Sequence, residues 1–398
     1  MAQATASRPA ATPIAEGFRT WEVLTIAGGH LTHDIFTSFL APLLPLIIQK
    51  LSLSLTLAGS LAAFQQLPSL INPFLGLLAD RGSLRWLVVL TPTVTAVVMC
   101  LMGIAPSYTT LSILLLVAGF STAAWHTPTP AMVARVSGRQ VGQGMSFFML
   151  GGSLAYTIGP LLAVAAVSWW GLEGIWRLVP LAVACSAVLY WRTRDIITTR
   201  PAIRSDGSLL ESLRELARVF LPIAGITLTQ GFMLSAFSTF LPTFMQAEGA
   251  NLWLAGSSFS IYELAGAVGT ITSGTLSDRL GRHRVLAFFS LAAPVLMLLF
   301  LAVRGWAMIL MLPMVGFAAL SATPVMMALI QEHSRDHPAT ANGLYFALNF
   351  VSRALIIVVV GAMADWWGLR VAYQWSALIG FAALPFVLLL PRKTTADR

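Results

Sequence analysis

About twelve apolar segments, each long enough to cross a membrane as a helix, run through this chain of 398 residues. The mean hydropathy is +0.79 and only 10% of the residues are charged, which excludes an ordinary soluble globular protein. The alternation with period two that is typical of membrane-spanning strands is absent, so the segments are expected to be helices. They lie near residues 21–49, 53–79, 86–105, 109–134, 141–167, 174–191, 219–246, 252–277, 285–303, 305–330, 338–364 and 370–390.

The basic residues follow a membrane topology. The net charge is +8, a balance that in a soluble protein would suggest nucleic acid. If both termini and every second connection lie on one side of the membrane, that side collects most of the arginines. The other side has only Lys50, Arg177, Arg304 and Arg370. This bias predicts a multi-pass protein of the inner (plasma) membrane with both termini in the cytoplasm, and no nucleic-acid partner.

The chain is expected to consist of two similar halves. The longest polar connection separates a bundle of six helices at 21–192 from a second at 219–391, with a cytoplasmic linker at 193–218 and short cytoplasmic tails at 1–20 and 392–398. "WWGL" occurs at Trp169–Leu172 and again at Trp366–Leu369, 197 residues later, and two further echoes have nearly the same offset. Parallel six-helix repeats are a transporter architecture, with the binding site between the halves near the middle of the membrane.

A few ionisable side chains interrupt the apolar interiors of the helices. Such groups cost several kcal/mol in a membrane unless they are paired or face water, so each marks a functional site by default. They are His30, His33, Asp34, His126, Glu263 and Arg353.

His30, His33 and Asp34 are spaced i, i+3 and i+4, which places them on one helix face. We expect this face to line the cavity between the halves, with Asp34 as the main proton carrier and the two histidines as proton shuttles or substrate contacts. Two alternatives remain open. The three side chains could fix helix packing through hydrogen bonds, or they could bind zinc or another divalent ion together with His126.

Glu263 and Arg353 fall in the middle of helices in the second half. A buried arginine keeps its proton and needs an anion, which is either a protein carboxylate or a substrate group. We expect Glu263 and Arg353 to pair at rest, and an anionic substrate to compete for Arg353 while Glu263 takes up a proton. A permanent ion pair that holds two helices together is the alternative.

Several uncharged polar residues are further candidates for the lining of the substrate site, although hydrogen bonds between helices would explain them equally well. Together with His126 they are Gln65, Gln66, Tyr156, Gln230, Tyr262, Tyr345 and Asn349.

The segment "GTLSDRLGRHR" resembles the cytoplasmic signature of the major facilitator superfamily of transporters. Its matching residues are Gly274, Asp278, Arg279, Gly281 and Arg282. A first copy, "GLLADRGSLRW", contributes Gly76, Asp80, Arg81 and, one position late, Arg85. The resemblance implies an all-α membrane protein of twelve helices in two pseudo-symmetric bundles, in which these residues take part in gating.

Within that superfamily, "GGHLTHDIFTSFLAPLLPLI" and "AAWHTPTPAMVARVSG" resemble the first and fourth helices of fosmidomycin-resistance-type efflux proteins. This resemblance implies a secondary transporter that exports a small amphipathic or anionic compound, a drug or a metabolite, by proton antiport and alternating access.

Other functions remain open. The same architecture could import an organic anion with protons, or move a lysolipid between leaflets. A divalent-metal transporter is less favoured because no cysteine or further carboxylate joins the histidines and Asp34. A membrane-embedded enzyme is less favoured because no nucleophile motif or HExxH is present. The chain also has no GxxxxGK[ST] loop for ATP. We expect no cofactor and no resident metal, a small-molecule substrate, protons and membrane lipids as partners, and a monomer.

Overall fold

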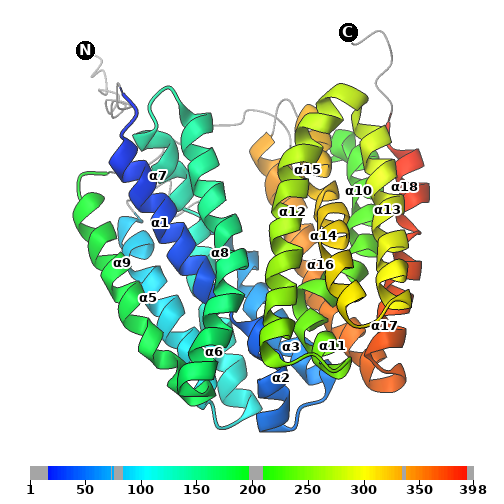
Figure 1. Cartoon of the computed structure of the whole chain (residues 1–398). Helices are drawn as coiled ribbons and strands as arrows, with labels where there is room; N and C mark the ends of the chain where they lie inside the picture. Colours follow the sequence, from blue (N-terminus) through cyan, green and yellow to red (C-terminus); the bar gives the residue numbers. More distant parts are fainter. Residues whose placement is uncertain (1–16, 73, 76–83, 197–208, 334–337, 392–398) are drawn as a thin grey trace, which may run out of the picture.

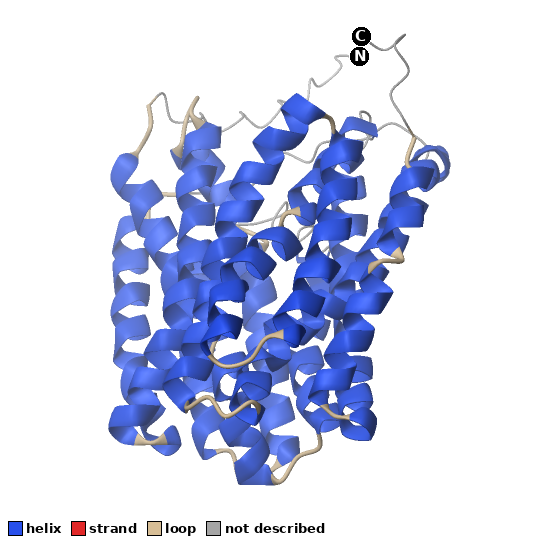
Figure 2. Cartoon of the chain, turned by 45° about the vertical axis from the view of Figure 1, so that its right-hand side comes forward, coloured by secondary structure: helices blue, strands red, loops and turns tan. Residues whose placement is uncertain are grey.

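Helices form two side-by-side groups in the computed structural model of the chain (Figure 1). The structure describes residues 17–72, 74–75, 84–196, 209–333 and 338–391, and these residues contain no strand (Figure 2). The all-helical architecture expected from the sequence is therefore confirmed. The start of α1 and the end of α18 lie at the same end of the molecule (Figure 1).

The elements of the first group are α1 (Thr20–Thr37), α2 (Leu40–Leu51), α3 (Leu55–Gln66), η1 (Leu67–Ile71), α5 (Arg85–Leu101), η2 (Met102–Ile104), α6 (Tyr108–His126), α7 (Thr129–Val136), α8 (Val141–Trp170), η3 (Leu172–Leu178) and α9 (Val179–Arg192). Those of the second group are α10 (Leu209–Ser235), η4 (Ala236–Phe240), α11 (Leu241–Ala247), α12 (Leu252–Leu280), α13 (Arg282–Ala302), α14 (Trp306–Leu320), α15 (Ala322–His333), α16 (Pro338–Trp367), α17 (Leu369–Gly380) and α18 (Ala383–Leu389).

Ten helical stretches of the described chain are long and apolar enough to span a membrane. Two of the twelve expected spans fall outside this number. The span near 53–79 is represented by the shorter apolar helix Leu55–Ile71, and α12 has 29 residues but carries Glu263 and several serines and glycines, which lower its hydropathy. Helix α10 begins at Leu209, inside the segment expected to be a linker, because leucines spaced three and four residues apart continue the helix beyond its apolar part.

Prolines set the breaks within the spans. Pro42 has no N–H to bond to the carbonyl of Ser38, and α1 ends at Thr37 while α2 begins at Leu40. Ahead of Pro242 the chain forms a π-helix at Ala236–Phe240. The hydroxyl of Tyr373 donates to the carbonyl of Ala236 at 2.7 Å and so satisfies a group in this irregular turn.

The repeat seen in the sequence is also a structural repeat. Both "WWGL" copies end a long helix at a glycine with positive φ, +72° at Gly171 after α8 and +82° at Gly368 after α16. Only glycine adopts this backbone region without strain, which explains why both copies contain it.

Each group has an ion pair at positions that the repeat relates to each other. Lys50 corresponds to Glu248 and Glu173 corresponds to Arg370, so the acidic and basic residues are exchanged. In the first group Lys50 lies 3.3 Å from Glu173 and donates to the carbonyl of Gly103 at 2.7 Å. In the second, Arg370 binds both carboxylate oxygens of Glu248, at 3.1 and 2.6 Å, and also donates to a backbone carbonyl, that of Leu301. An ion pair therefore joins helix ends at the same place in both groups, with the basic and acidic residues exchanged.

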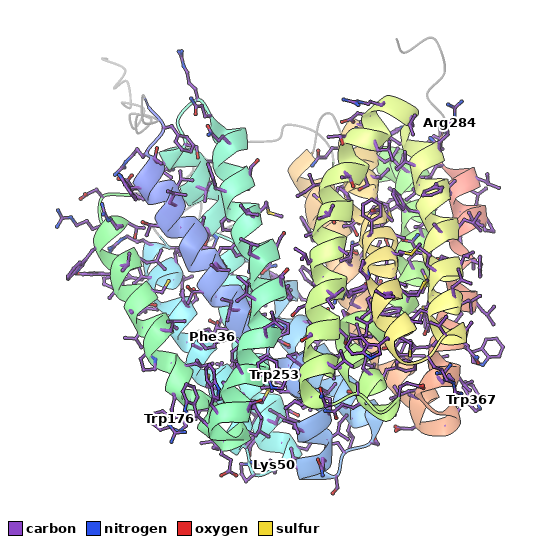
Figure 3. All side chains as sticks on the ribbon, in the orientation of Figure 1. Phe36, Lys50, Trp176, Trp253, Arg284 and Trp367 are labelled. Atoms are coloured by element: carbon purple, nitrogen blue, oxygen red, sulfur yellow. The ribbon has the colours of Figure 1, made fainter. Side chains whose placement is uncertain are left out.

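The two groups contact each other through α3 with α16, α8 with α12, and α2 with α11. They approach at the end where Lys50, Trp176 and Trp367 lie, and their ribbons diverge toward the end that carries Arg284 (Figures 1 and 3). We refer to these as the Lys50 end and the Arg284 end.

Candidate functional site

Three imidazoles surround the carboxylate of Asp34. Nε2 of His30 lies 3.1 Å from Oδ2, Nδ1 of His33 lies 2.7 Å from Oδ1, and Nε2 of His126 lies 3.6 Å from Oδ2. The first two histidines share the α1 face predicted from their spacing, and His126 comes from the end of α6. The structure therefore brings together four residues that the sequence singled out.

Two of these rings have their tautomer fixed by the backbone. Nδ1 of His30 meets the carbonyl of Phe148 at 2.7 Å, and Nδ1 of His126 meets the carbonyl of Thr122 at 3.0 Å. A carbonyl only accepts, so both Nδ1 atoms carry a hydrogen. In the neutral rings both Nε2 atoms are then bare, yet they lie 3.2 Å apart and beside Oδ2 of Asp34. Three acceptor atoms meet with no hydrogen among them, and one added proton would satisfy the arrangement.

The third ring, that of His33, continues the network away from the carboxylate. Nδ1 of His33 faces Oδ1 of Asp34, and Nε2 of His33 lies 3.0 Å from Oγ1 of Thr95, which in turn contacts Ser121 at 2.8 Å. His33 stacks on the buried indole of Trp125 with 5.3 Å between ring centroids. Its orientation is thus held by both packing and hydrogen bonds.

This His–Asp cluster, formed by His30, His33, Asp34 and His126, lies inside the first group of helices. His30 and Asp34 are only 4% exposed and His33 is fully buried. The α1 face therefore does not line the cavity between the halves as the sequence predicts, but packs on Thr95 of α5, Trp125 of α6 and Phe148 of α8. Only the side chain of His126, 36% exposed, opens the cluster toward its surroundings.

The same atoms also meet the simplest requirements of a metal site. Nε2 of His30, Nε2 of His126 and Oδ2 of Asp34 all lie within 4.8 Å of one another. Zinc prefers ligands of these types, and their Nδ1 atoms are anchored as ligand imidazoles usually are. The geometry is compatible with one cation at this point, a proton or a divalent ion.

A cavity of about 160 Å³ lies between the two groups of helices. Residues from both groups line it. They are Thr37, Ser38, Leu40, Ala41, Ala62, Gln65, Gln66, Ser69, Thr122 and Tyr156 from the first, and Ser238, Thr239, Phe259, Phe350 and Arg353 from the second. Thr122, whose carbonyl binds His126, connects this cavity with the His–Asp cluster.

Arg353 supplies the cationic group of the cavity. Its Nη2 donates to Oγ of Ser238 at 2.9 Å, and its Nε has no hydrogen-bond partner. The expected resting ion pair with Glu263 is not formed, since among the described residues no carboxylate oxygen lies within 4.0 Å of the guanidinium. Ser238 lies in the π-helix η4, and its hydroxyl accepts from Arg353 where the sequence predicted the carboxylate of Glu263.

The uncharged candidates divide into two sets. Gln65, Gln66 and Tyr156 line the cavity with Arg353. Gln230 instead binds Ser290 at 2.8 Å between α10 and α13, and Tyr262 stacks on Phe237 inside the second group.

Tyr345 and Asn349 also lie away from the cavity lining. The amide of Asn349 donates to the carbonyl of Tyr345 on the preceding turn of α16. The phenol of Tyr345 is buried. Asn349 therefore has a contact typical of a helix interior, while the hydroxyl of Tyr345 has no hydrogen-bond partner among the described residues.

The second copy of the superfamily signature forms a compact charged turn. Gly281 links α12 to α13 at φ +90°, and Arg282 lies 2.5 Å from Asp278 and 3.2 Å from Glu332 of α15. Arg279 is exposed, and nothing within 4 Å would meet a side chain at Gly274.

In the first copy, Gly76, Asp80 and Arg81 lie outside the described residues. Arg85 donates to the carbonyls of Thr193 and Tyr190. It therefore holds the carboxyl end of α9 within its own group.

Some lining residues carried no signal in the sequence. Ser238, Thr37 and Phe350 are ordinary residues of a membrane helix, and only the fold shows that they face one cavity. Pro242 was a usable signal for Ser238, because a proline four residues later leaves the carbonyl of Ser238 without its helical partner.

The comparisons with known proteins agree with this architecture. The family model described as Major Facilitator Superfamily matches residues 26–357. The fosmidomycin resistance protein of Escherichia coli (strain K12) is 24% identical over 363 residues, covering 89% of each chain. An uncharacterized MFS-type transporter, YfnC of Bacillus subtilis (strain 168), is 22% identical over 96% of this chain and 95% of its own.

Two solved structures share the fold. A bacterial homolog of the human lysosomal transporter Spinster, in an inward-facing and unoccupied conformation, has a TM-score of 0.74 at 16% identity and covers 94% of each chain. The nucleoside transporter NupG has a TM-score of 0.73 at 16% identity, covering 94% of this chain and 99% of its own.

Proposed function

The chain belongs to the Major Facilitator Superfamily, whose members are transporters and not enzymes, and we propose that it exports a small amphipathic or anionic compound in exchange for protons. The observation that carries the proposal is the meeting of three acceptor atoms in the His–Asp cluster. A site that is complete only with one added cation, beside a cavity between two helix groups, has the parts that proton antiport needs. Its relative named for fosmidomycin resistance supports the direction of export.

In this mechanism the proton enters through His126, the exposed member of the cluster, and is shared with His30 and Asp34. Protonation neutralises the buried carboxylate and changes the hydrogen bonds that join α1 to α6. Since the carbonyl of Thr122 is held by His126, this change reaches the wall of the cavity. Proton binding and substrate binding are thereby coupled through one helix.

Substrate recognition is assigned to Arg353 and its neighbours. The guanidinium has an Nε without a partner and, among the described residues, no carboxylate oxygen within 4.0 Å, so an anionic group of the substrate is its natural counter-ion. Phe259 and Phe350 supply apolar surface for the rest of the compound, and Gln65, Gln66 and Tyr156 supply hydrogen-bonding groups. Glu263, near Arg353 but not paired with it, is a second proton acceptor in the proposal.

The Arg284 end is assigned to the cytoplasm, since α13 begins there with Arg282 and Arg284, while Lys50, Trp176 and Trp367 lie at the opposite end (Figure 3). The chain would then be closed at its outer end in this conformation. We expect it to lie in the inner membrane with both termini in the cytoplasm, and to work as a monomer because each chain contains both halves of the cavity.

The function is tested in everted membrane vesicles energised by respiration, with a pH-sensitive dye that reports the acidity of the interior. Fosmidomycin and a panel of organic anions and drugs are added in turn. Export by antiport predicts that one compound releases protons from vesicles with the protein and not from vesicles without it. Acidification of the interior, or proton release only on adding a divalent metal salt, would reject the proposal in favour of import or metal transport.

A further inference from the structure

Two equivalent helix crossings close the molecule at the Lys50 end. The segment "LTLAGS" at the start of α3 recurs as "LWLAGS" at the start of α12, 197 residues later, and α3 crosses α16 as α12 crosses α8. Each crossing has a glycine at the equivalent position, Gly59 in α3 and Gly256 in α12, where the neighbouring helix approaches closely. A Cβ on Gly59 would lie 2.7 Å from the carbonyl of Ile357, and one on Gly256 would lie 2.5 Å from Val164.

At the Lys50 end, the crossing of α3 with α16 contains a carboxylate that the other crossing does not have at the equivalent position. Asp365, near the end of α16, accepts hydrogen bonds from two backbone N–H groups of the first turn of α3, those of Leu55 at 2.7 Å and Thr56 at 2.8 Å. The hydroxyl of Thr56 adds a third bond at 2.5 Å. The N–H groups of a first turn have no partner within their helix, and the helix dipole also favours a negative charge there.

The repeat identifies the residue of the crossing of α8 with α12 that corresponds to Asp365. Asp365 precedes the second "WWGL", and Ser168 precedes the first. Both helices have a side-chain cap of their own, since Asn251 accepts from the N–H of Leu254 at the start of α12 and Ser54 accepts from that of Leu57 at the start of α3. One crossing is therefore joined by a carboxylate from the opposite half, while the other has a serine at that position.

We infer that Asp365 is a positioning residue that acts as a latch: its carboxylate holds α3 against α16 and keeps the Lys50 end of the transporter closed in this conformation. The inference rests on the proposed function, because it assumes alternating access with the Lys50 end outside. Opening that end separates α16 from α3 and breaks three hydrogen bonds to a carboxylate. With Ser168 in the equivalent place, the crossing of α8 with α12 has no carboxylate there to release, so the two crossings are expected to open unequally.

The latch is tested by the accessibility of the cavity from each side. Ala62, which lines the cavity, is replaced with cysteine in a chain without native thiols (Cys100→Ala, Cys185→Ala). A membrane-impermeant maleimide is added to intact cells, which reports opening to the outside, and to everted vesicles, which reports opening to the cytoplasm. No substrate is needed, so failure of the latch is distinguishable from failure of the proposed function, which the proton assay reports.

Asp365→Asn replaces one of the two acceptor oxygens with an NH2 group, which cannot accept a hydrogen bond from Leu55 or Thr56. We expect it to raise the labelling rate in cells by about tenfold, since hydrogen bonds to a charged group are the strong ones, and to lower the rate in everted vesicles. Ser168→Ala, at the equivalent position, should change neither rate. Equal labelling of wild type and Asp365→Asn in cells would overturn the inference. So would an increase from both sides, which a loosened fold produces, or an equal effect of Ser168→Ala.

Discussion

At the scale of single residues, the backbone decides what the ionisable side chains of the His–Asp cluster can do. The carbonyls of Phe148 and Thr122 hold His30 and His126 by their Nδ1 atoms and turn both Nε2 atoms toward Asp34. A spacing of i and i+4 predicts that His30 and Asp34 meet, but it carries no information on which nitrogen faces the carboxylate. That choice depends on α6 and α8, which are far away in the sequence.

Arg353 offers a test of anion recognition at the same scale. Arg353→Lys keeps the positive charge and loses the planar fork that binds an anion with two hydrogen bonds. We expect the half-saturating substrate concentration in the vesicle assay to rise about tenfold or more, with a smaller effect on the maximal rate.

Arg304→Lys is the matched control, because Arg304 is exposed and lies far in sequence from every lining residue. Unchanged saturation in Arg353→Lys would remove the guanidinium from substrate recognition. Equal rises of the half-saturating concentration in both variants would show that the assay responds to replacement of any arginine, and not to the guanidinium of Arg353 in particular.

At the scale of helices, close backbone contacts fix how the halves meet at the Lys50 end. A Cβ at Gly361 would lie 2.4 Å from the carbonyl of Leu55, so α16 approaches α3 with no room for any side chain. Small residues at such a crossing let the two helix backbones approach closely.

Gly361→Ala should therefore force α3 and α16 apart. We expect transport in the vesicle assay to fall by more than half, and the melting temperature of the purified protein to drop, as for an overpacked contact that costs about 1–3 kcal/mol. Gly28→Ala is the control, since nothing lies within 4 Å of a Cβ there and alanine favours a helix. Full activity of Gly361→Ala would mean that the crossing has more space than the structure shows.

The sequence predicts helices better than it predicts their contacts. Hydropathy located the apolar helices, and the "WWGL" repeat located two helix ends, because both signals are local. The pairing of Glu263 with Arg353 was wrong for this conformation, since proximity of two helices does not decide which turn faces which. The gating role of Gly76, Asp80 and Arg81 in the first signature copy remains a prediction, because these three residues lie outside the described part of the chain.

At the scale of the whole molecule, the repeat explains why both halves need a charged tie at the Lys50 end. The Lys50–Glu173 pair and the Glu248–Arg370 pair occupy equivalent positions with exchanged charges. Each cation also donates to the carbonyl at the end of a neighbouring helix. The architecture therefore specifies a tie between helix ends, and either order of charges supplies it.

Exchange of the charges in the second half tests this symmetry. Arg370→Glu alone places two carboxylates together and should lower the melting temperature by several degrees, as expected for loss of a bidentate, partly buried pair. Combining Arg370→Glu with Glu248→Lys recreates the order of the first half, and we expect it to recover most of the loss. A double variant no more stable than Arg370→Glu would show that the positions are not equivalent.

The central claim is that the His–Asp cluster holds the proton that the transporter exchanges for its substrate. The most direct test is to add substrate, found with the vesicle panel, to purified protein in a weakly buffered solution with a pH dye. Wild-type protein should release about one proton per bound substrate, and Asp34→Asn should release none while isothermal calorimetry still detects binding. Equal proton release by both proteins would contradict the account and place the exchanged proton elsewhere in the chain.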